Sequence, residues 1–165
     1  MSKENKKNNK VVIISASICG AVIAIIVLLL TVTEPIIGII KLSNVREAAE
    51  SCDEIVISAP LYKDAFLQGA EAVVIGEDAK ALSDAFIKAT ENTDFDDVYV
   101  SASGFWDTKL EFYGDGERYS GYLCDDEIYV ARGVKVYRFE IEDECEALYE
   151  AFLSRVNSIL DEQKK

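Results

Sequence analysis

The stretch VVIISASICGAVIAIIVLLLTVT, residues 11–33, holds no charged side chain, and fourteen of its positions are Val, Ile or Leu. Coiled as an α-helix at about 1.5 Å per residue, it would be roughly 34 Å long. The hydrocarbon core of a bilayer is about 30 Å thick. The aliphatic side chains together favour insertion by roughly 6 kcal/mol. The stretch therefore predicts one membrane-spanning helix.

Charge is divided unevenly on the two sides of this stretch. Residues 1–10 carry a net charge of +3 and the whole chain carries −13, so residues 34–165 carry −16. Short basic flanks stay in the cytoplasm. This predicts a cytoplasmic N-terminus, a location in the cell membrane and an extracytoplasmic C-terminal domain. A domain this acidic is repelled by phosphate backbones, which argues against nucleic-acid binding.

Two alternatives compete with a retained signal-anchor. A cleaved secretory signal has an apolar core of about 7–15 residues followed by a small-residue cleavage site, but this run is longer and its small triplet at 15–17 comes too early. A lipidated Cys19 would need a small residue before it, where Ile18 stands.

Small residues at intervals of four form a stripe that either packs against a second helix or faces lipid. The helix-packing candidates in that stripe are Ala16, Gly20 and Ala24.

The part of the chain after the apolar stretch is long enough for one compact domain. We divide the chain into a basic tail (1–10), a transmembrane helix (11–33), a juxtamembrane segment (34–52), an extracytoplasmic domain (53–160) and a polar tail (161–165). In the juxtamembrane segment, Pro35 is expected to end or kink the membrane helix. Residues 39–42 are expected to form a strand, and Asn44 with Glu47 to cap a short helix.

Within the domain, apolar patterns of strand and helix period alternate. Residues 54–59 and 72–75 predict strands, and residues 77–91 predict an amphipathic helix with Glu77 and Asp78 in its first turn. From residue 97 to 141 the period is two, with turn residues between short runs, which predicts an antiparallel meander of about five strands.

A final helix is predicted after the meander, beginning with a capping box formed by Asp143 and Glu146. Its apolar stripe comprises Cys145, Leu148, Tyr149, Phe152, Val156, Ile159 and Leu160. The elements together predict an α+β domain, in which two amphipathic helices pack on one face of an antiparallel sheet.

The order of the segments IIKLSN (39–44), EIVI (54–57), AVVI (72–75) and GFWD (104–107) resembles that of small uncharacterised membrane-anchored surface domains of Gram-positive bacteria. The resemblance covers most of residues 39–142. It implies a bacterial, membrane-anchored protein with the same topology. It implies no activity, because none of these segments is chemically specific.

Candidate chemistry is sparse. The chain has no histidine, which excludes Ser–His and Cys–His nucleophile pairs and His-containing zinc sites within it. Asn92, Asp94 and Asp96 have the spacing of the first three ligands of a calcium loop, but Asp97 and Ser103 stand where that loop needs Gly and Glu. We therefore predict no metal site, no cofactor and no catalytic residue.

Three cysteines follow the apolar stretch: Cys52, Cys124 and Cys145. An odd count without a Cys-x-x-Cys pair argues against a complete disulfide framework. One disulfide bond among the three, with the third cysteine as a free thiol, stays open as an alternative. Cys145 falls on the apolar stripe of the final helix, which indicates a role in core packing.

Aromatic residues give the most specific indication of function. Exposed aromatic side chains on a rigid sheet suit binding to a peptide, a wall glycan or a partner protein, whereas half-buried tyrosines are also good strand formers. The candidates are Tyr99, Phe105, Tyr113, Tyr122 and Tyr129.

The sequence thus predicts a single-pass membrane protein with a non-catalytic binding or accessory domain. Its expected partners are the lipid bilayer and either a partner protein or a cell-wall ligand. Two alternatives stay open: a surface hydrolase that uses paired carboxylates, and an acidic regulatory domain on the cytoplasmic side. The identity of the ligand and the oligomeric state are open as well.

Overall fold

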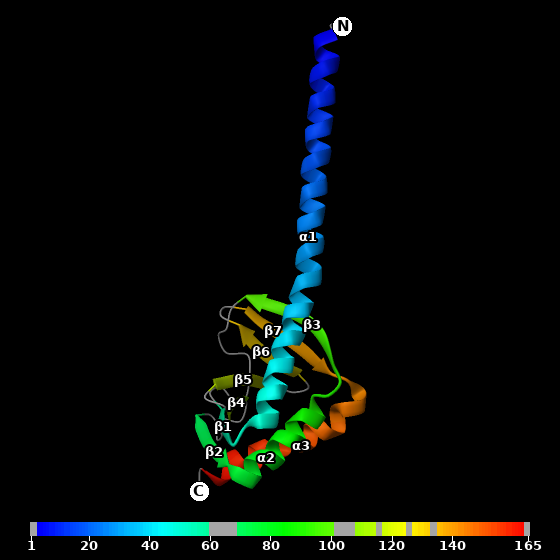
Figure 1. Cartoon of the computed structure of the whole chain (residues 1–165). Coiled ribbons are helices and arrows are strands. Elements are labelled where there is room, and N and C mark those ends of the chain that lie inside the picture. Colours follow the sequence, from blue (N-terminus) through cyan, green and yellow to red (C-terminus); the bar gives the residue numbers. More distant parts are fainter. Residues whose placement is uncertain are drawn as a thin grey trace. The chain divides into compact units, whose positions relative to one another are not determined.

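The protein is described from a computed structural model, which covers residues 3–59, 69–100, 108–114, 117–124, 127–132 and 135–163. Its elements follow in the order α1, β1, β2, α2, β3 to β7, and α3 (Figure 1). The chain divides into two compact units, Met1–Ile36 and Ile37–Lys165. The described residues of the first unit are helical, and the second unit holds the sheet.

Helix α1 (Lys3–Ser51) contains the apolar stretch that was predicted to span a membrane. Its described apolar side chains in the first unit are exposed; Ile23 is 62% and Leu28 64% exposed. Within the described part of the chain, α1 is the one helix long and apolar enough to cross a bilayer. Its length and composition agree with the predicted membrane helix.

Helix α1 does not end at Pro35 but runs through it. The strand expected at residues 39–42 and the helix cap expected at Asn44 were therefore wrong, because this whole segment is helical. A proline inside a helix costs about 3 kcal/mol. Each aliphatic side chain buried after it contributes roughly 1.5–3 kcal/mol, so the packing of the following turns outweighs the proline.

The last turns of α1 belong to the core of the domain. Leu42, Val45, Ala49 and Cys52 are all buried, and their spacings of three, four and three residues are those of one helical face. The second unit begins at Ile37. This compact unit therefore includes residues 37–52, which the sequence assigns to the juxtamembrane segment.

Two contacts hold this part of α1 against the rest of the domain. Gly38 lets the helix approach the sheet closely, because an added Cβ would lie 3.0 Å from Cδ1 of Tyr137. Arg46 donates through Nε to Oγ1 of Thr90 at 3.2 Å and through Nη2 to Oγ1 of Thr93 at 3.1 Å. Burial lowers the pKa of the Arg46 guanidinium. Arg46 thereby connects α1 to residues 90 and 93.

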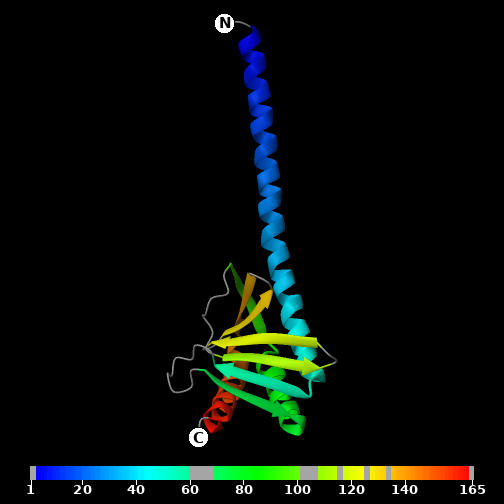
Figure 2. The ribbon, with the colours of Figure 1, turned by 90° about the vertical axis from the view of Figure 1, so that its left-hand side faces the viewer.

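Seven strands form one antiparallel sheet in the order β2-β1-β4-β5-β6-β7-β3 (Figure 2). The strands are β1 (Glu54–Ala59), β2 (Ala70–Ile75), β3 (Thr93–Val100), β4 (Thr108–Gly114), β5 (Glu117–Cys124), β6 (Glu127–Arg132) and β7 (Lys135–Ile141). β1 has the predicted bounds, and β2 begins two residues before the predicted strand.

The predicted five-strand meander is correct for β4 to β7 and wrong for β3. β3 does not pair with β4 but lies at the far edge of the sheet beside β7. The chain reaches that edge from β2, at the opposite edge, through helix α2 (Gly76–Ala89). A period-two pattern does not specify which strand is the neighbour. Here Phe95 and Phe139 contact each other edge to face, with ring centroids 5.8 Å apart.

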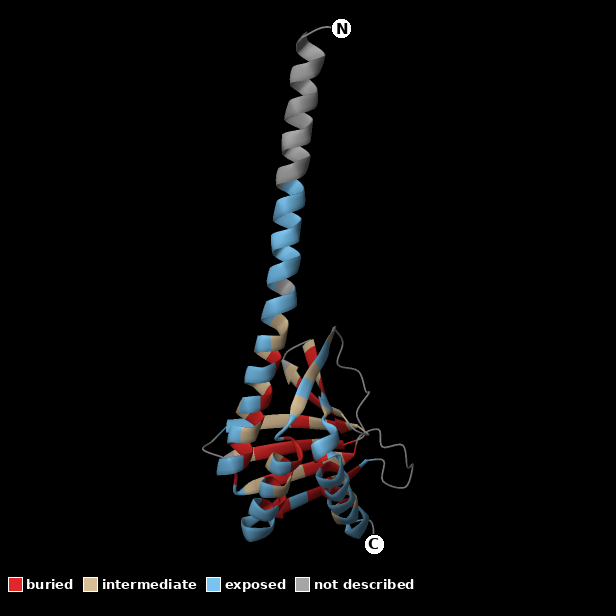
Figure 3. Cartoon of the chain, turned by 90° about the vertical axis from the view of Figure 1, so that its right-hand side faces the viewer, coloured by how far each residue is buried: buried red, intermediate tan, exposed pale blue. Residues whose placement is uncertain are grey.

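Helix α2, helix α3 (Asp143–Glu162) and the last turns of α1 cover one face of the sheet, which we call the inner face (Figures 1 and 2). Phe86 of α2 lies between Phe112 of β4 and Phe152 of α3, with ring centroids 4.9 and 5.7 Å away. Buried residues concentrate where helices and strands meet (Figure 3). The predicted α+β fold, with helices on one face of an antiparallel sheet, is confirmed.

The final helix differs from its prediction in two details. Its N-cap is Glu142, which makes no side-chain capping bond, so the capping box predicted at Asp143 and Glu146 was wrong. The two acids lie in the first turn instead, where the helix dipole favours them. Leu148 is 50% exposed, because it lies at the margin of the buried stripe. The rest of the stripe is buried or partly buried.

Candidate functional site

The face of the sheet away from the helices, which we call the outer face, carries an ordered line of polar side chains. Successive side chains in a strand alternate between the two faces, and the register of the strands aligns one outer-face residue from each. This line, the transverse row, runs from β2 to β3 through Glu71, Ser58, Lys109, Tyr122, Tyr129, Arg138 and Asp97. Two tyrosines form its centre, a cation stands beside each, and an acid stands at each end.

Three of the five predicted aromatic residues lie on the outer face: Tyr113, Tyr122 and Tyr129. Tyr122 and Tyr129 are paired across β5 and β6, and they belong to one small cluster with Val136. Tyr129 is only 8% exposed, so it does not meet the expectation of an exposed aromatic. Tyr122 is half-buried. Tyr99 lies in β3, paired in register with Val136, and Phe105 lies outside the described residues.

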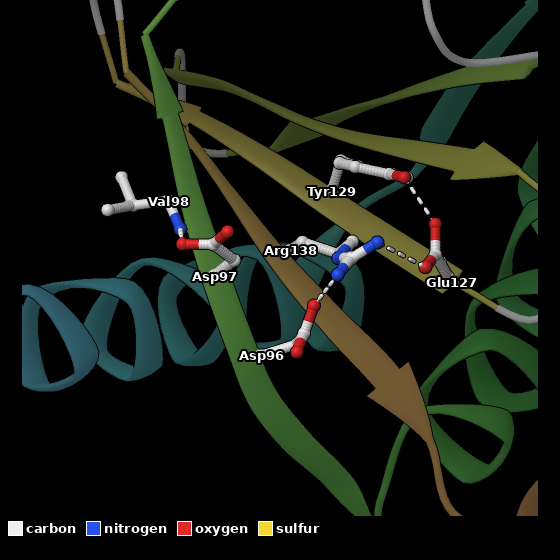
Figure 4. Close-up of polar contacts among 6 residues, drawn as sticks. All are labelled: Asp96, Asp97, Val98, Glu127, Tyr129 and Arg138. Carbon is white, nitrogen blue, oxygen red and sulfur yellow. Dashed lines mark hydrogen bonds and ion pairs between the residues drawn. The ribbon is translucent and has the colours of Figure 1, made fainter.

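Arg138 connects three strands on this face (Figure 4). Its Nη1 donates to Oε1 of Glu127 on β6 at 3.0 Å, and its Nη2 forms an ion pair with Oδ2 of Asp96 on β3. The Tyr129 hydroxyl donates to the other carboxylate oxygen of Glu127. Bonds to ionised groups are stronger than neutral ones. Glu127 therefore fixes both a cation and a tyrosine of the transverse row.

A second ion-pair network lies on β4 and β5, around Glu111. The side chain of Glu111 is 9% exposed, and its Oε1 lies 2.7 Å from Nη2 of Arg118 and within ion-pair distance of Nζ of Lys109. Tyr113 donates to Oε2 at 3.4 Å. The Lys109 Nζ also lies 6.0 Å from the centre of the Tyr122 ring, within cation–π range.

The two networks determine what the outer face can do chemically. They hold a pair of tyrosines between two cations, each of which is balanced by its own carboxylate. The half-buried Tyr122 can stack against a flat or apolar group, and the neighbouring Lys109 ammonium can donate to acceptor oxygens. Such a surface is suited to recognition.

Acidic side chains gather elsewhere, in a hollow beside the start of α3. Its lining comprises Asp94, Glu140, Ile141, Glu142, Asp143 and Glu144. The acids are all exposed, so water solvates them, and the hollow offers no desolvated carboxylate of the kind a glycosidase acid needs. Among the described residues, no group of three His, Cys, Asp or Glu side chains is placed to hold a metal ion.

The buried thiols serve the core. The Cys52 Sγ lies 2.9 Å from Oγ of Ser83. Burial raises the pKa of the Cys52 thiol, and the contact with Ser83 lowers it by less. The Cys145 Sγ contacts the carbonyl oxygen of Lys88 at 3.7 Å. No disulfide joins the cysteines that the structure describes.

The helix-packing candidates lie in the first unit. Gly20 and Ala24 are exposed on α1, and a Cβ added at Gly20 would meet no atom within 4 Å. The side chain of Ala16 lies outside the described part of the structure. Packing of this stripe against a second helix stays a prediction.

The prediction from sequence named the tyrosines but not the charged residues that contact them. These residues are Lys109, Glu111, Glu127 and Arg138. Part of the signal was visible, because residues 109, 111 and 113 alternate onto one face of a strand, as do 127 and 129. Which residues of neighbouring strands stand opposite one another was not visible. Comparisons of the chain with protein-family models, with curated proteins and with solved structures found no match.

Proposed function

We propose that this chain is a single-pass membrane protein whose acidic α+β domain lies outside the cytoplasm and acts as a binding module. The outer face of the sheet is the proposed recognition surface. One observation carries the binding role: the transverse row places Tyr122 and Tyr129 side by side between Lys109 and Arg138. The role is non-catalytic, and the expected ligand is a partner protein or a cell-wall component.

Two features support the anchoring. The apolar part of α1 is long enough for a bilayer, and its apolar side chains are exposed, which is costly in water and favourable in lipid. The four lysines of residues 1–10 favour a cytoplasmic N-terminus.

Anchoring and orientation are tested in cells. Alkaline carbonate should leave the protein in the membrane pellet, and protease added to intact cells should digest the domain. In a variant in which Lys3, Lys6, Lys7 and Lys10 are all glutamine, part of the protein should insert with the opposite orientation and resist the protease. Domain that resists protease on intact cells would support a cytoplasmic regulatory module instead. Recovery of a trimmed domain from the medium would show a cleaved signal.

Binding at the outer face is tested by placing a photo-crosslinking benzoylphenylalanine at Tyr122 in the full chain. The matched control carries it at Leu148, which is 50% exposed on α3 and away from the sheet. A partner protein should give a crosslinked product from Tyr122 and none from Leu148. If the ligand is a cell-wall component, soluble muropeptides should bind the full chain. Tyr122→Ala should weaken that binding about tenfold. The absence of both a crosslinked product and muropeptide binding would overturn the proposal.

A further inference from the structure

The two edges of the sheet differ in how they are protected. Edge strands present unpaired backbone groups, and proteins block them with bulges and charged residues. β3 has both devices: its pairing with β7 is interrupted between Phe95 and Asp97, and its exposed residues include Asp94, Asp96 and Asp97. β3 is thus a poor template for a further strand.

β2, at the other edge, has no bulge, and Glu71 is its one charged residue. Its pairing with β1 is regular over all six residues, from Ala70 to Ile75. On the outer face Val73 is 56% and Ile75 65% exposed. Among the described residues, no strand pairs with β2 on the side away from β1. A regular, β-branched and exposed edge of this kind is a template for strand addition.

A hollow runs along this edge and would receive side chains from an added strand. Val73, Val74 and Ile75 form its strand side, and Ile159 and Arg155 of α3 form the helix side. Alternate residues of an added strand would point toward α3, where Ile159 offers an apolar contact, and the others would lie beside Val73 and Ile75.

The charge around the edge identifies the kind of partner. Glu71 lies on β2, Asp78 on α2 and Glu162 at the end of α3, and all three are exposed. Arg155 is the one cation in the lining of the hollow, and its Nη1 donates to the carbonyl of Ala81 at 3.4 Å. A second copy of this chain would bring the same acids together, in a domain with a net charge of −16. Charge complementarity therefore favours a cationic strand.

We propose that the edge of β2 docks an extended, cationic segment of a partner protein, which adds to the sheet beside Val73 and Ile75. This surface is separate from the transverse row, and the inference does not depend on the function proposed for that row. Backbone hydrogen bonds would supply the affinity, and the acids around the hollow would select the charge.

The test uses the full chain in nanodiscs of neutral lipid and a short synthetic peptide in which lysine and valine alternate. A control peptide carries the same lysines with proline in place of valine, so it has the charge but cannot form a strand. We expect the first peptide to bind and to slow hydrogen exchange of the amides in β2. The control peptide should bind about tenfold more weakly or not at all.

Variants then locate the site. Asp78→Lys and Val73→Lys should each weaken binding of the lysine–valine peptide by about fivefold to tenfold, since each places a cation against a cation. Leu148→Lys makes the same kind of change at an equally exposed apolar residue of α3 and should leave binding unchanged. If a variant fails to fold, hydrogen exchange of the unmodified chain with the two peptides still decides the question.

Three outcomes would overturn the proposal. Equal binding of both peptides would mean attraction of charge without strand addition. Unchanged hydrogen exchange in β2 would place the peptide elsewhere. Protection of β2 that grows with protein concentration, without any peptide, would identify a second copy as the occupant.

Discussion

The two faces of the sheet are built on different principles although the same strands form both. On the inner face Phe112 is fully buried against Phe86 of α2 and needs no polar partner. On the outer face its neighbour Glu111 is nearly as buried, but its charge is balanced by Lys109 and Arg118. Burial of apolar area stabilises the inner face. Ion pairs and hydrogen bonds order the outer face.

The largest expected effect separates the two faces at consecutive residues of β4. Phe112→Ala should lower the free energy of unfolding by about 3–5 kcal/mol, because it leaves a cavity beside Phe86. Tyr113→Ala, one residue on and facing outward, should cost less than about 1.5 kcal/mol. Urea unfolding of both variants measures the difference, and equal losses would contradict the distinction between the faces.

The next effect tests how closely α1 approaches the inner face. Gly38→Leu should lower the free energy of unfolding by about 1–3 kcal/mol, because the new side chain meets the Tyr137 ring, already 3.0 Å from an added Cβ. The helix propensity of leucine would by itself raise stability. A stabilised variant would therefore show that the close contact does not exist. Gly20→Leu, where nothing lies within 4 Å, is the matched control.

On the outer face, we expect the charge of the Glu111 carboxylate to contribute to stability. Glu111→Gln keeps the shape of the side chain and removes the charge that Lys109 and Arg118 face. We expect a loss of about 1–2 kcal/mol in low salt, which should shrink as salt screens the exposed part of the network. Unfolding at two salt concentrations measures this. A loss that salt does not change would contradict a screened ion-pair network as its cause.

The smallest effect concerns the buried Cys52 thiol, which contacts Ser83 on the helix side of the sheet. Burial raises the pKa of the Cys52 thiol above its ordinary value of 9.0. The unfolded chain therefore loses this proton first as pH rises. The stability that the protonated thiol contributes is present below pH 9.0 and is lost as pH rises through the folded pKa.

Cys52→Ala should remove that loss. Between about pH 8 and pH 10 the variant should lose less stability than the unmodified chain, by under about 1 kcal/mol. Urea unfolding across this range measures the two slopes, and equal slopes would mean that Cys52 does not titrate differently in the two states.

Prediction from sequence succeeded where one element buries one periodic face. The pattern of residues 54–59 gave β1 its correct bounds, and the spacing of Leu82, Phe86 and Ala89 placed α2 within two residues. It failed at residues 39–42, where a short apolar run fits a strand as well as a helix. It failed also for the position of β3, because alternation identifies a strand but not its neighbour. For the candidate site it named Tyr122 and Tyr129, whose binding role stays a prediction, and it did not name Arg138.

The sequence by itself determined the apolar length of α1, the acidity of the domain and the α+β class, since these follow from composition and local period. Only the tertiary structure decided that α1 continues into the core, that β3 closes the sheet beside β7, and that Lys109, Tyr122, Tyr129 and Arg138 stand in one row. The physical reason is that hydrophobic periodicity is a property of one segment. Strand order and register depend on contacts between segments that lie far apart in the chain.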